Sequence, residues 1–250
     1  MSLKVELIAI TPEAERVIEE AGRTAYLSFD RFTPKPILRL SGRRQLLYTE
    51  NHPELEKARV GDRVKLEGKE FLVEERWENS AEKFIKMLIR SGHLSVLEHA
   101  SASFRIRGGS RSFTHQLVRH RMASFTQQSQ RYVNEENFHF VTPPSIEGNP
   151  EALKVYREFM EEARRVYARL RGLKIKKEDA RFVLPNAVFS EIVITANFRE
   201  WRHILELRGS RHAQWEIRRM AVEVLRILQE KAPSVFHDLR IEGDYIVRRA

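Results

Sequence analysis

The chain has 250 residues, 42% of which are hydrophobic, and it contains no cysteine. This composition is typical of a globular protein with a sizeable core, and it excludes a disulfide scaffold, a Cys-ligated zinc site and a thiol nucleophile. No apolar run approaches the ~18 residues of a membrane span, and the charged N-terminus does not resemble a signal peptide. We therefore expect a soluble cytoplasmic protein without membrane contact.

The charge is strongly basic, with 44 Lys and Arg against 35 Asp and Glu, a net charge of +9. Such a balance indicates either an anionic partner or a charge-rich surface. The stretch from His99 to Asn134 favours the anionic partner, because it holds no carboxylate where about five are expected from the composition. Guanidinium groups bind phosphate and carboxylate in a bidentate manner. The arginines of this stretch are Arg105, Arg107, Arg111, Arg119, Arg121 and Arg131.

A strand and a helix are predicted at the start of the chain. Residues 3–10 alternate apolar and charged side chains, as a half-buried strand does. Thr11 and Pro12 are typical of a helix start, because Thr is a common N-cap residue and Pro is tolerated in the first turn. We expect Thr11 to cap a helix that ends near Arg23.

A β-rich segment is predicted at about residues 33–77. After a proline-rich break, residues 63–73 form two alternating runs about Gly68-Lys69, a pattern typical of a hairpin. We expect this segment to be a small subdomain inserted into a single domain that spans residues 1–250.

The rest of the chain predicts helices and strands without regular alternation. Asn79 and Asn197 are placed to cap helices, and Gly108-Gly109 is expected to turn the chain from a strand into a helix. The expected helices cover about 79–92, 110–122, 149–172, 178–184, 197–208 and 213–231, and the expected strands cover 101–107 and 188–196. No phosphate loop or G-x-G-x-x-G occurs. The predicted class is α+β, with helices around a mainly antiparallel sheet and a small β-rich insertion.

The densest polar segment spans residues 119–131. It reads R-H-R-x-x-S-x-x-x-x-S-x-R, which resembles the signature of the flavin-dependent thymidylate synthases. The matching residues are Arg119, His120, Arg121, Ser124, Ser129 and Arg131. Further elements similar to this family are Gly92-His93 with Glu98-His99, Arg181 to Pro185, Asn197-x-Arg199, and Leu207 to Ile217.

The resemblance implies an enzyme that converts dUMP to dTMP, as a homotetramer with active sites at subunit interfaces. It implies that methylenetetrahydrofolate supplies the carbon and that FAD, reduced by NADPH, supplies the hydride.

Two residues are the catalytic candidates. Arg208 matches the family arginine at the N3–C4–O4 edge of uracil, where negative charge must be stabilised. It would act as a fixed charge, because an arginine keeps its proton at ordinary pH. Ser129 could attack the ring, but a serine needs an adjacent base and the sequence shows none, so positioning of the nucleotide is favoured.

The resemblance also implies two sets of binding residues. The dUMP set is Gln116, Arg119, Gln127, Ser129, Arg131, Arg181 and Arg208. The FAD set is Ser95, Arg119, His120, Arg121, Gln127, Asn197, Arg199 and His203. Ser95 and His203 depart from the Thr and Asn that the family often has there, although both can form hydrogen bonds.

Two other interpretations are weighed against this one. A metal site at His93, His99, His115 and His120 is not expected, because no pair has the zinc-hydrolase spacing and acids are absent nearby. A basic nucleic-acid-binding protein without catalytic activity is the alternative function. It explains the charge but not the lack of lysine, which usually accompanies backbone binding.

Overall fold

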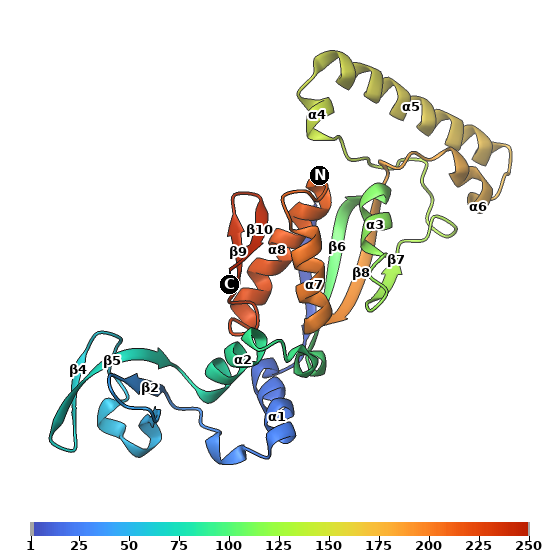
Figure 1. The fold of residues 1–250 in the computed structure, drawn as a ribbon. Helices are drawn as coiled ribbons and strands as arrows, with labels where there is room; N and C mark the ends of the chain where they lie inside the picture. Colours follow the sequence, from blue (N-terminus) through green and yellow to red (C-terminus); the bar gives the residue numbers. More distant parts are fainter. Residues whose placement is uncertain (1–2, 250) are drawn as a thin grey trace.

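The structure is a computed structural model in which residues 3–249 are described (Figure 1). Its strands are β1 (Lys4–Ile10), β2 (Ile37–Leu40), β3 (Leu47–Tyr48), β4 (Arg63–Leu66), β5 (Lys69–Trp77), β6 (Ser101–Ser110), β7 (Ser124–Gln127), β8 (Phe189–Asn197), β9 (Leu239–Glu242) and β10 (Tyr245–Arg248). Its helices are α1 (Ala14–Tyr26), α2 (Ser80–Arg90), α3 (Arg111–Leu117), α4 (Pro144–Glu147), α5 (Pro150–Gly172), α6 (Lys177–Ala180), α7 (Phe198–Arg208) and α8 (Trp215–Lys231). The predicted α+β class is confirmed.

The central sheet has the strand order β1-β6-β8-β7, and every neighbouring pair is antiparallel. Alternation along β6 and β8 places one set of apolar residues on the face that packs against α7 and α8. Trp201 of α7 packs edge-on against Phe104, with ring centroids 5.0 Å apart, and its Nε1 donates to the carbonyl of Ala102. This core fixes α7 against the sheet.

The opposite face of the central sheet is polar. Its arginines pair with carboxylates on neighbouring strands: Arg105 Nη2 lies 2.6 Å from Glu191 Oε2, and Arg107 Nη2 lies 3.2 Å from Glu6 Oε2. The expectation that the acid-free stretch reserves its arginines for an anion is therefore wrong for these two. Their partners are 86 and 101 residues away in sequence.

A second sheet, with the order β3-β2-β5-β4, is formed within residues 37–77. Figure 1 shows it beyond α1 and α2, away from the central sheet. It has its own cluster of buried apolar residues: Leu38, Leu40, Leu47, Leu55, Val64, Leu66 and Val73. The hairpin turns at Glu67-Gly68 rather than at the predicted Gly68-Lys69, because Glu67 and Gly68 both have positive φ, of 53° and 75°. That pair of angles is what a tight hairpin turn requires.

An arm formed by α4, α5 and α6 projects from the other side of the core (Figure 1). Asn149 caps α5, since its side chain accepts from the N–H groups of Glu151 and Ala152. The arm is tied to the core through a small apolar cluster of Phe138, Met160, Ala163 and Val188.

Two local predictions near the sheet are wrong. Thr11 does not cap α1; its Oγ1 accepts from the N–H of Ser101 at 2.9 Å, and the helix begins only at Ala14. Gly108-Gly109 is not a turn, because β6 continues to Ser110 through an irregularity between Ile106 and Gly109. Pairing with other strands holds both segments in the sheet.

The predicted helix over 110–122 is shorter than expected. Helix α3 ends at Leu117, and β7, which the sequence analysis did not predict, begins at Ser124. The residues between them, which include part of the 119–131 signature, therefore lie in a connection between helix and strand.

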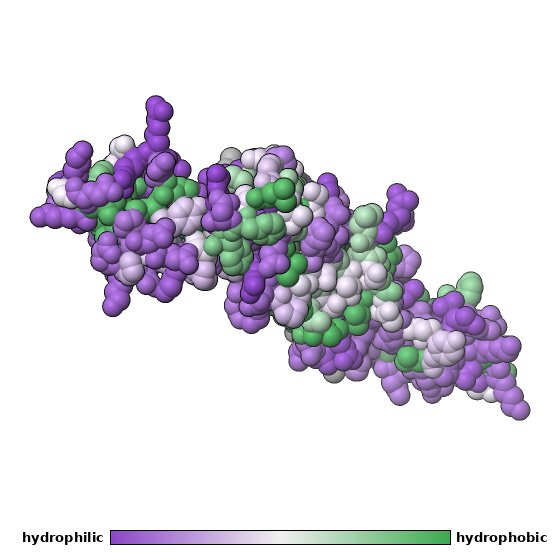
Figure 2. Space-filling model, turned by 90° about the horizontal axis from the view of Figure 1, so that it is seen from below, coloured by the Kyte–Doolittle hydropathy of each residue, from purple (hydrophilic) through white to green (hydrophobic). Residues whose placement is uncertain are grey.

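Several large apolar side chains are exposed, among them Leu27 at 82%, Met122 at 74%, Tyr132 at 75% and Phe182 at 84%. Figure 2 shows apolar patches separated by hydrophilic surface on the face seen from below. Within residues 3–249, no helix is both long and apolar enough to cross a membrane.

Candidate active site

His120 is the most buried of the predicted site residues, with 5% of its surface exposed. Each nitrogen of its ring faces a side chain from α7. Nδ1 lies 3.3 Å from Glu200 Oε1, and Nε2 accepts a hydrogen bond of 2.9 Å from Arg208 Nε. The ring of His203 packs edge-on at 5.6 Å. The structure thus brings two other predicted site residues, Arg208 and His203, against this imidazole.

Burial determines the charge of this imidazole. Desolvation, followed by the nearby positive charge of Arg208 and the ring of His203, lowers the pKa of His120 to about 4. His120 is therefore neutral near pH 7. A neutral ring has one donor and one acceptor nitrogen, which is what two different partners require.

Arg208 is the last residue of α7, and its guanidinium is held at two points. Besides the bond from Nε to His120, Nη2 donates to the carbonyl oxygen of Gln116 at 3.1 Å. Burial lowers the pKa of Arg208 from its ordinary value, but an arginine stays charged in a protein. In the described part of the chain Nη1 has no hydrogen-bond partner, so this donor is available to a ligand.

A cavity of about 500 Å³ lies beside this cluster. It is lined by Asn197, Arg199 and His203 of the predicted FAD set, together with Glu200 and Met122. Glu200 also contacts His120, so the cavity and the His120 cluster share a wall.

The first turn of α7 organises that wall. Asn197 caps the helix, because its Oδ1 accepts from the N–H of Glu200 at 2.8 Å. Arg199 Nη1 lies 2.6 Å from Glu98 Oε1, a largely exposed pair. The predicted N-x-R element therefore supplies a helix start and a cation at one cavity.

Three further residues of the predicted FAD set are exposed. Arg119, Arg121 and Ser95 lie on the surface. Within residues 3–249, neither Arg119 nor Arg121 forms an ion pair. In the connection after α3, the buried His120 is thus flanked in sequence by two exposed cations, one before it and one after it.

A second group of predicted residues lies near the arm. The N–H of Arg131 donates to Ser129 Oγ at 3.3 Å, and Arg131 Nε donates to Glu178 Oε2 at 3.1 Å. Arg181 Nε donates to the carbonyl of Glu178 at 3.2 Å. In the described chain no His or carboxylate contacts Ser129 Oγ.

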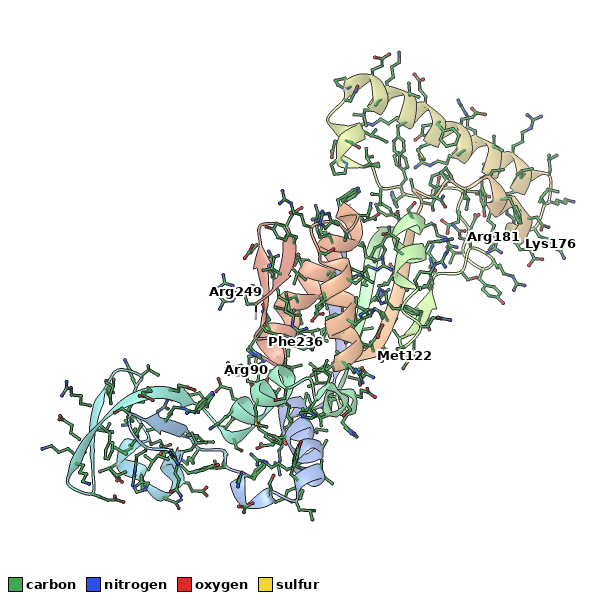
Figure 3. All side chains as sticks on the ribbon, in the orientation of Figure 1. Arg90, Met122, Lys176, Arg181, Phe236 and Arg249 are labelled. Atoms are coloured by element: carbon green, nitrogen blue, oxygen red, sulfur yellow. The ribbon has the colours of Figure 1, made fainter. Side chains whose placement is uncertain are left out.

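The two groups of site residues are separate within one chain. No hydrogen bond or ion pair between described residues joins Ser129, Arg131 or Arg181 to the His120 and Arg208 cluster. Figure 3 shows Arg181 beside α6 in the arm, whereas Met122 lies at the end of the core where β7 and α7 begin. Within one copy, direct contacts between the described residues therefore do not join the whole predicted dUMP set.

The amide of Gln127 is already used by the fold. Its Nε2 donates to Thr114 Oγ1 at 3.0 Å and to Ser190 Oγ at 2.9 Å. Both amide protons are thereby engaged, and only its oxygen can serve a ligand.

Sequence reasoning missed the carboxylates that hold the site. Glu200, Glu98 and Glu178 each contact a predicted site residue. Glu98 was quoted only within the element Gly92-His93 with Glu98-His99, and the other two were not singled out. Glu200 stands three residues after Asn197, and this spacing is typical of a helix start. The spacing explains Glu200 as a helix-start residue and gives no sign of its contact with His120.

Glu216 was quoted only within the Leu207 to Ile217 element, and it turns out to hold α8 to the start of α3. It is buried and accepts from the N–H and the hydroxyl of Ser110, both at 2.7 Å. This contact positions α3, which carries Gln116. Among residues 3–249, no group of three or more His, Cys, Asp or Glu is arranged to hold a metal ion.

Comparison with known proteins shows which family the chain belongs to. Residues 6–234 match the family described as thymidylate synthase complementing protein. This chain belongs to that family. The match covers the 119–131 signature and both groups of site residues, so the resemblance seen in the sequence is confirmed.

Relatives named flavin-dependent thymidylate synthase are similar to the chain over much of its length. The one from Mycolicibacterium vanbaalenii is 46% identical over 173 residues, which cover 63% of this chain and 69% of the relative. The one from Mycobacteroides abscessus is 43% identical over 175 residues, covering 64% and 70%. The one from Corynebacterium diphtheriae is 42% identical over 170 residues, covering 62% and 68%. The chain is an enzyme of this thymidylate synthase family.

Proposed function

We propose that the chain catalyses the reductive methylation of dUMP to dTMP, with methylenetetrahydrofolate as carbon donor and NADPH-reduced FAD as hydride source. The observation that carries this proposal is the two-point hold on Arg208, which leaves Nη1 without a partner among the described residues. His120, which accepts one of these two bonds, also contacts Glu200 in the wall of a cavity lined by predicted FAD residues. Family membership and the names of the relatives support it.

The side chains around the cavity fit FAD. Asn197, Arg199 and His203 line it, and the unpaired Arg119 and Arg121 lie in the connection that leads to His120. Cations and amides of this kind suit a pyrophosphate and the polar edges of a flavin. The ion pair between Arg199 and Glu98 is largely exposed, and exposed ion pairs contribute little stability. A phosphate group could therefore replace Glu98 as the partner of Arg199. When bound and reduced, FAD would supply the hydride that completes the methyl group.

Arg208 would stabilise the charge that develops on the uracil edge. A fixed cation aimed at that edge before the reaction lowers the barrier without a proton transfer. Its two protein contacts restrict the guanidinium to one orientation. Ser129 would position the nucleotide, because among residues 3–249 no base forms a hydrogen bond with its Oγ.

We propose that the enzyme is a homotetramer whose sites combine residues of different subunits. One chain holds Arg208 and Gln116 in one place and Ser129, Arg131 and Arg181 in another. The exposed Met122 and Phe182 lie close in sequence to these two groups, at 74% and 84% exposure. A subunit interface over either group would cover one of these exposed side chains.

We also propose that the sheet within residues 33–77 is an inserted subdomain peripheral to the chemistry. Its buried cluster is separate from the core, and no predicted site residue lies in it.

The nucleic-acid alternative loses support from the paired arginines. Arg105 and Arg107 lie on the open face of the sheet, but each already has a carboxylate partner. A face with its cations paired offers little to a phosphate backbone.

The experiment that tests the proposed function measures dTMP formed from dUMP by the purified protein. Methylenetetrahydrofolate, NADPH and FAD are omitted one at a time, and the protein is examined for flavin absorbance. We expect a yellow protein that needs all three. A colourless protein that forms no dTMP and binds duplex DNA in a salt-dependent manner would favour the alternative.

A further inference from the structure

Glu200, His120 and Arg208 form one chain of hydrogen bonds. A guanidinium has donors only, so the 2.9 Å contact from Arg208 Nε requires an unprotonated Nε2 on His120. A neutral imidazole then carries its proton on Nδ1. That proton faces Glu200 Oε1, at 3.3 Å between heavy atoms.

The geometry of α7 makes this chain possible. Glu200 lies in the first turn and Arg208 is the last residue, eight positions later. Eight residues are a little over two helical turns, so both side chains lie on one face, about 12 Å apart along the axis. His120 comes from the connection after α3 and bridges the two ends of α7. Its ring cannot turn over without losing both partners.

We propose that Glu200 is a positioning residue for Arg208: by accepting the Nδ1 proton of His120, it fixes the tautomer whose Nε2 holds the guanidinium toward the substrate. This inference rests on the proposed role of Arg208 at the uracil edge. The family resemblance assigns His120 to the flavin and assigns no role to Glu200.

The surroundings of the ring agree with this assignment. The groups that face it are Glu200, His203 and Arg208 from α7, and Arg208 also bonds the carbonyl of Gln116 on α3. Burial raises the pKa of Glu200 from its ordinary value, while the nearby His203 favours its charged form. Either form of the carboxyl group can accept from Nδ1–H, since a protonated carboxyl keeps a carbonyl oxygen.

Two substitutions of similar size separate positioning from packing. Glu200→Gln keeps an acceptor oxygen at the same place, whereas Glu200→Met fills the same volume without one. In the holoenzyme we expect Glu200→Met to weaken dUMP binding and slow dTMP formation by about 10-fold or more. We expect Glu200→Gln to remain within about three-fold of wild type. Flavin content is measured for each variant and rates are compared per bound flavin, because Glu200 also lines the cavity proposed for FAD. Glu223→Ala, which removes an exposed carboxylate of α8, is the control.

A double-mutant cycle tests whether Glu200 acts through Arg208. In an Arg208→Met background, Glu200→Met should cause no further loss of dUMP affinity. An equal loss in both backgrounds would overturn the inference, as would Glu200→Gln and Glu200→Met being equally impaired. If Glu200→Met does not fold, Glu200→Ala takes its place in the cycle.

The tautomer is read directly by NMR of protein with ¹⁵N-labelled histidine, with the His120 signals identified by their loss in His120→Gln. We expect the Nδ1–H form in wild type and Glu200→Gln, and a mixture in Glu200→Met. An unchanged tautomer in Glu200→Met would overturn the inference. If wild type forms no dTMP, the proposed function fails, while the tautomer measurement still decides the role of Glu200.

Discussion

Arg208 Nε donates a 2.9 Å hydrogen bond to His120 Nε2, so a buried neutral imidazole orients a permanently charged side chain. A cation held by a neutral acceptor keeps its charge available to a ligand, whereas a carboxylate partner would neutralise it. Arg131 shows the contrast, because Glu178 pairs with it on the surface. The arginine proposed to act on the reacting ring thus has no carboxylate partner among the described residues.

Arg208→Lys is expected to slow dTMP formation by about 10²–10³-fold, the usual cost of losing one aligned group that stabilises developing charge. Lysine has a single ammonium and cannot reach His120 and the carbonyl of Gln116 while presenting a planar donor to the substrate. Steady-state rates with saturating dUMP and methylenetetrahydrofolate measure this effect, and flavin content serves as the folding control. A rate within a few-fold of wild type would contradict the role given to Arg208.

The free energy of unfolding should depend on pH through His120. Its pKa is about 4 in the folded protein, against an ordinary value of 6.5 in the unfolded chain. Between these values the unfolded chain binds the extra proton, so the contribution of His120 to stability falls as the pH drops from about 6.5 to about 4 and changes no further below that. Urea unfolding of wild type and His120→Gln over this range measures the difference. Parallel curves for the two proteins would show that His120 is not buried in its neutral form.

Substitution of Glu216 should destabilise the protein. Glu216→Ala leaves the N–H and hydroxyl of Ser110 without their acceptors in a buried place, a loss of about 2 kcal/mol or more. Glu216→Gln retains one carbonyl oxygen and should cost less. Denaturant unfolding measures both, and equal stability of Glu216→Ala and wild type would rule out this contact as a hold on α3.

Features encoded in neighbouring residues were predictable from the sequence. Asn79, Asn149 and Asn197 each cap a helix, because a cap needs only the residue and the N–H groups that follow within three positions. The strand at 101–107 was predictable from its alternation, and the strand at 188–196 from its run of apolar and β-branched residues.

Features that depend on distant residues were not predictable. The partners of Arg105 and Arg107 come from β8 and β1, so the local absence of acids was misleading. Strand β7 has one strongly apolar residue, Phe125, and it forms because β8 offers a free edge. The contact of Glu200 with His120 joins residues 80 positions apart, and only the packing of α7 on the sheet brings them together.

Removal of the second sheet should leave the chemistry intact. The ends of this segment meet at one point: the N–H of Ser80 donates to the carbonyl of Thr33, and the N–H of Thr33 donates to the hydroxyl of Ser80. A short Gly-Ser linker can therefore replace residues 35–77 without moving α1 or α2. Most of the segment's buried apolar residues form a cluster of their own that shares no member with the core cluster, so we expect its removal to expose little of the core.

We expect the shortened protein to bind FAD and to retain NADPH-driven flavin reduction and methyl transfer within about three-fold of the full chain, each half-reaction being assayed separately. Thr33 and Ser80 are kept in this variant, which preserves the contact between the two ends of the segment. Assembly and flavin content are measured to show whether the core has folded. A variant that assembles and binds FAD but loses one half-reaction would place the segment in the active site. Charged residues of the segment such as Arg43, Arg44 and Lys57 would then be the first to substitute singly, because a neighbouring subunit could bring them to the folate tail or to NADPH.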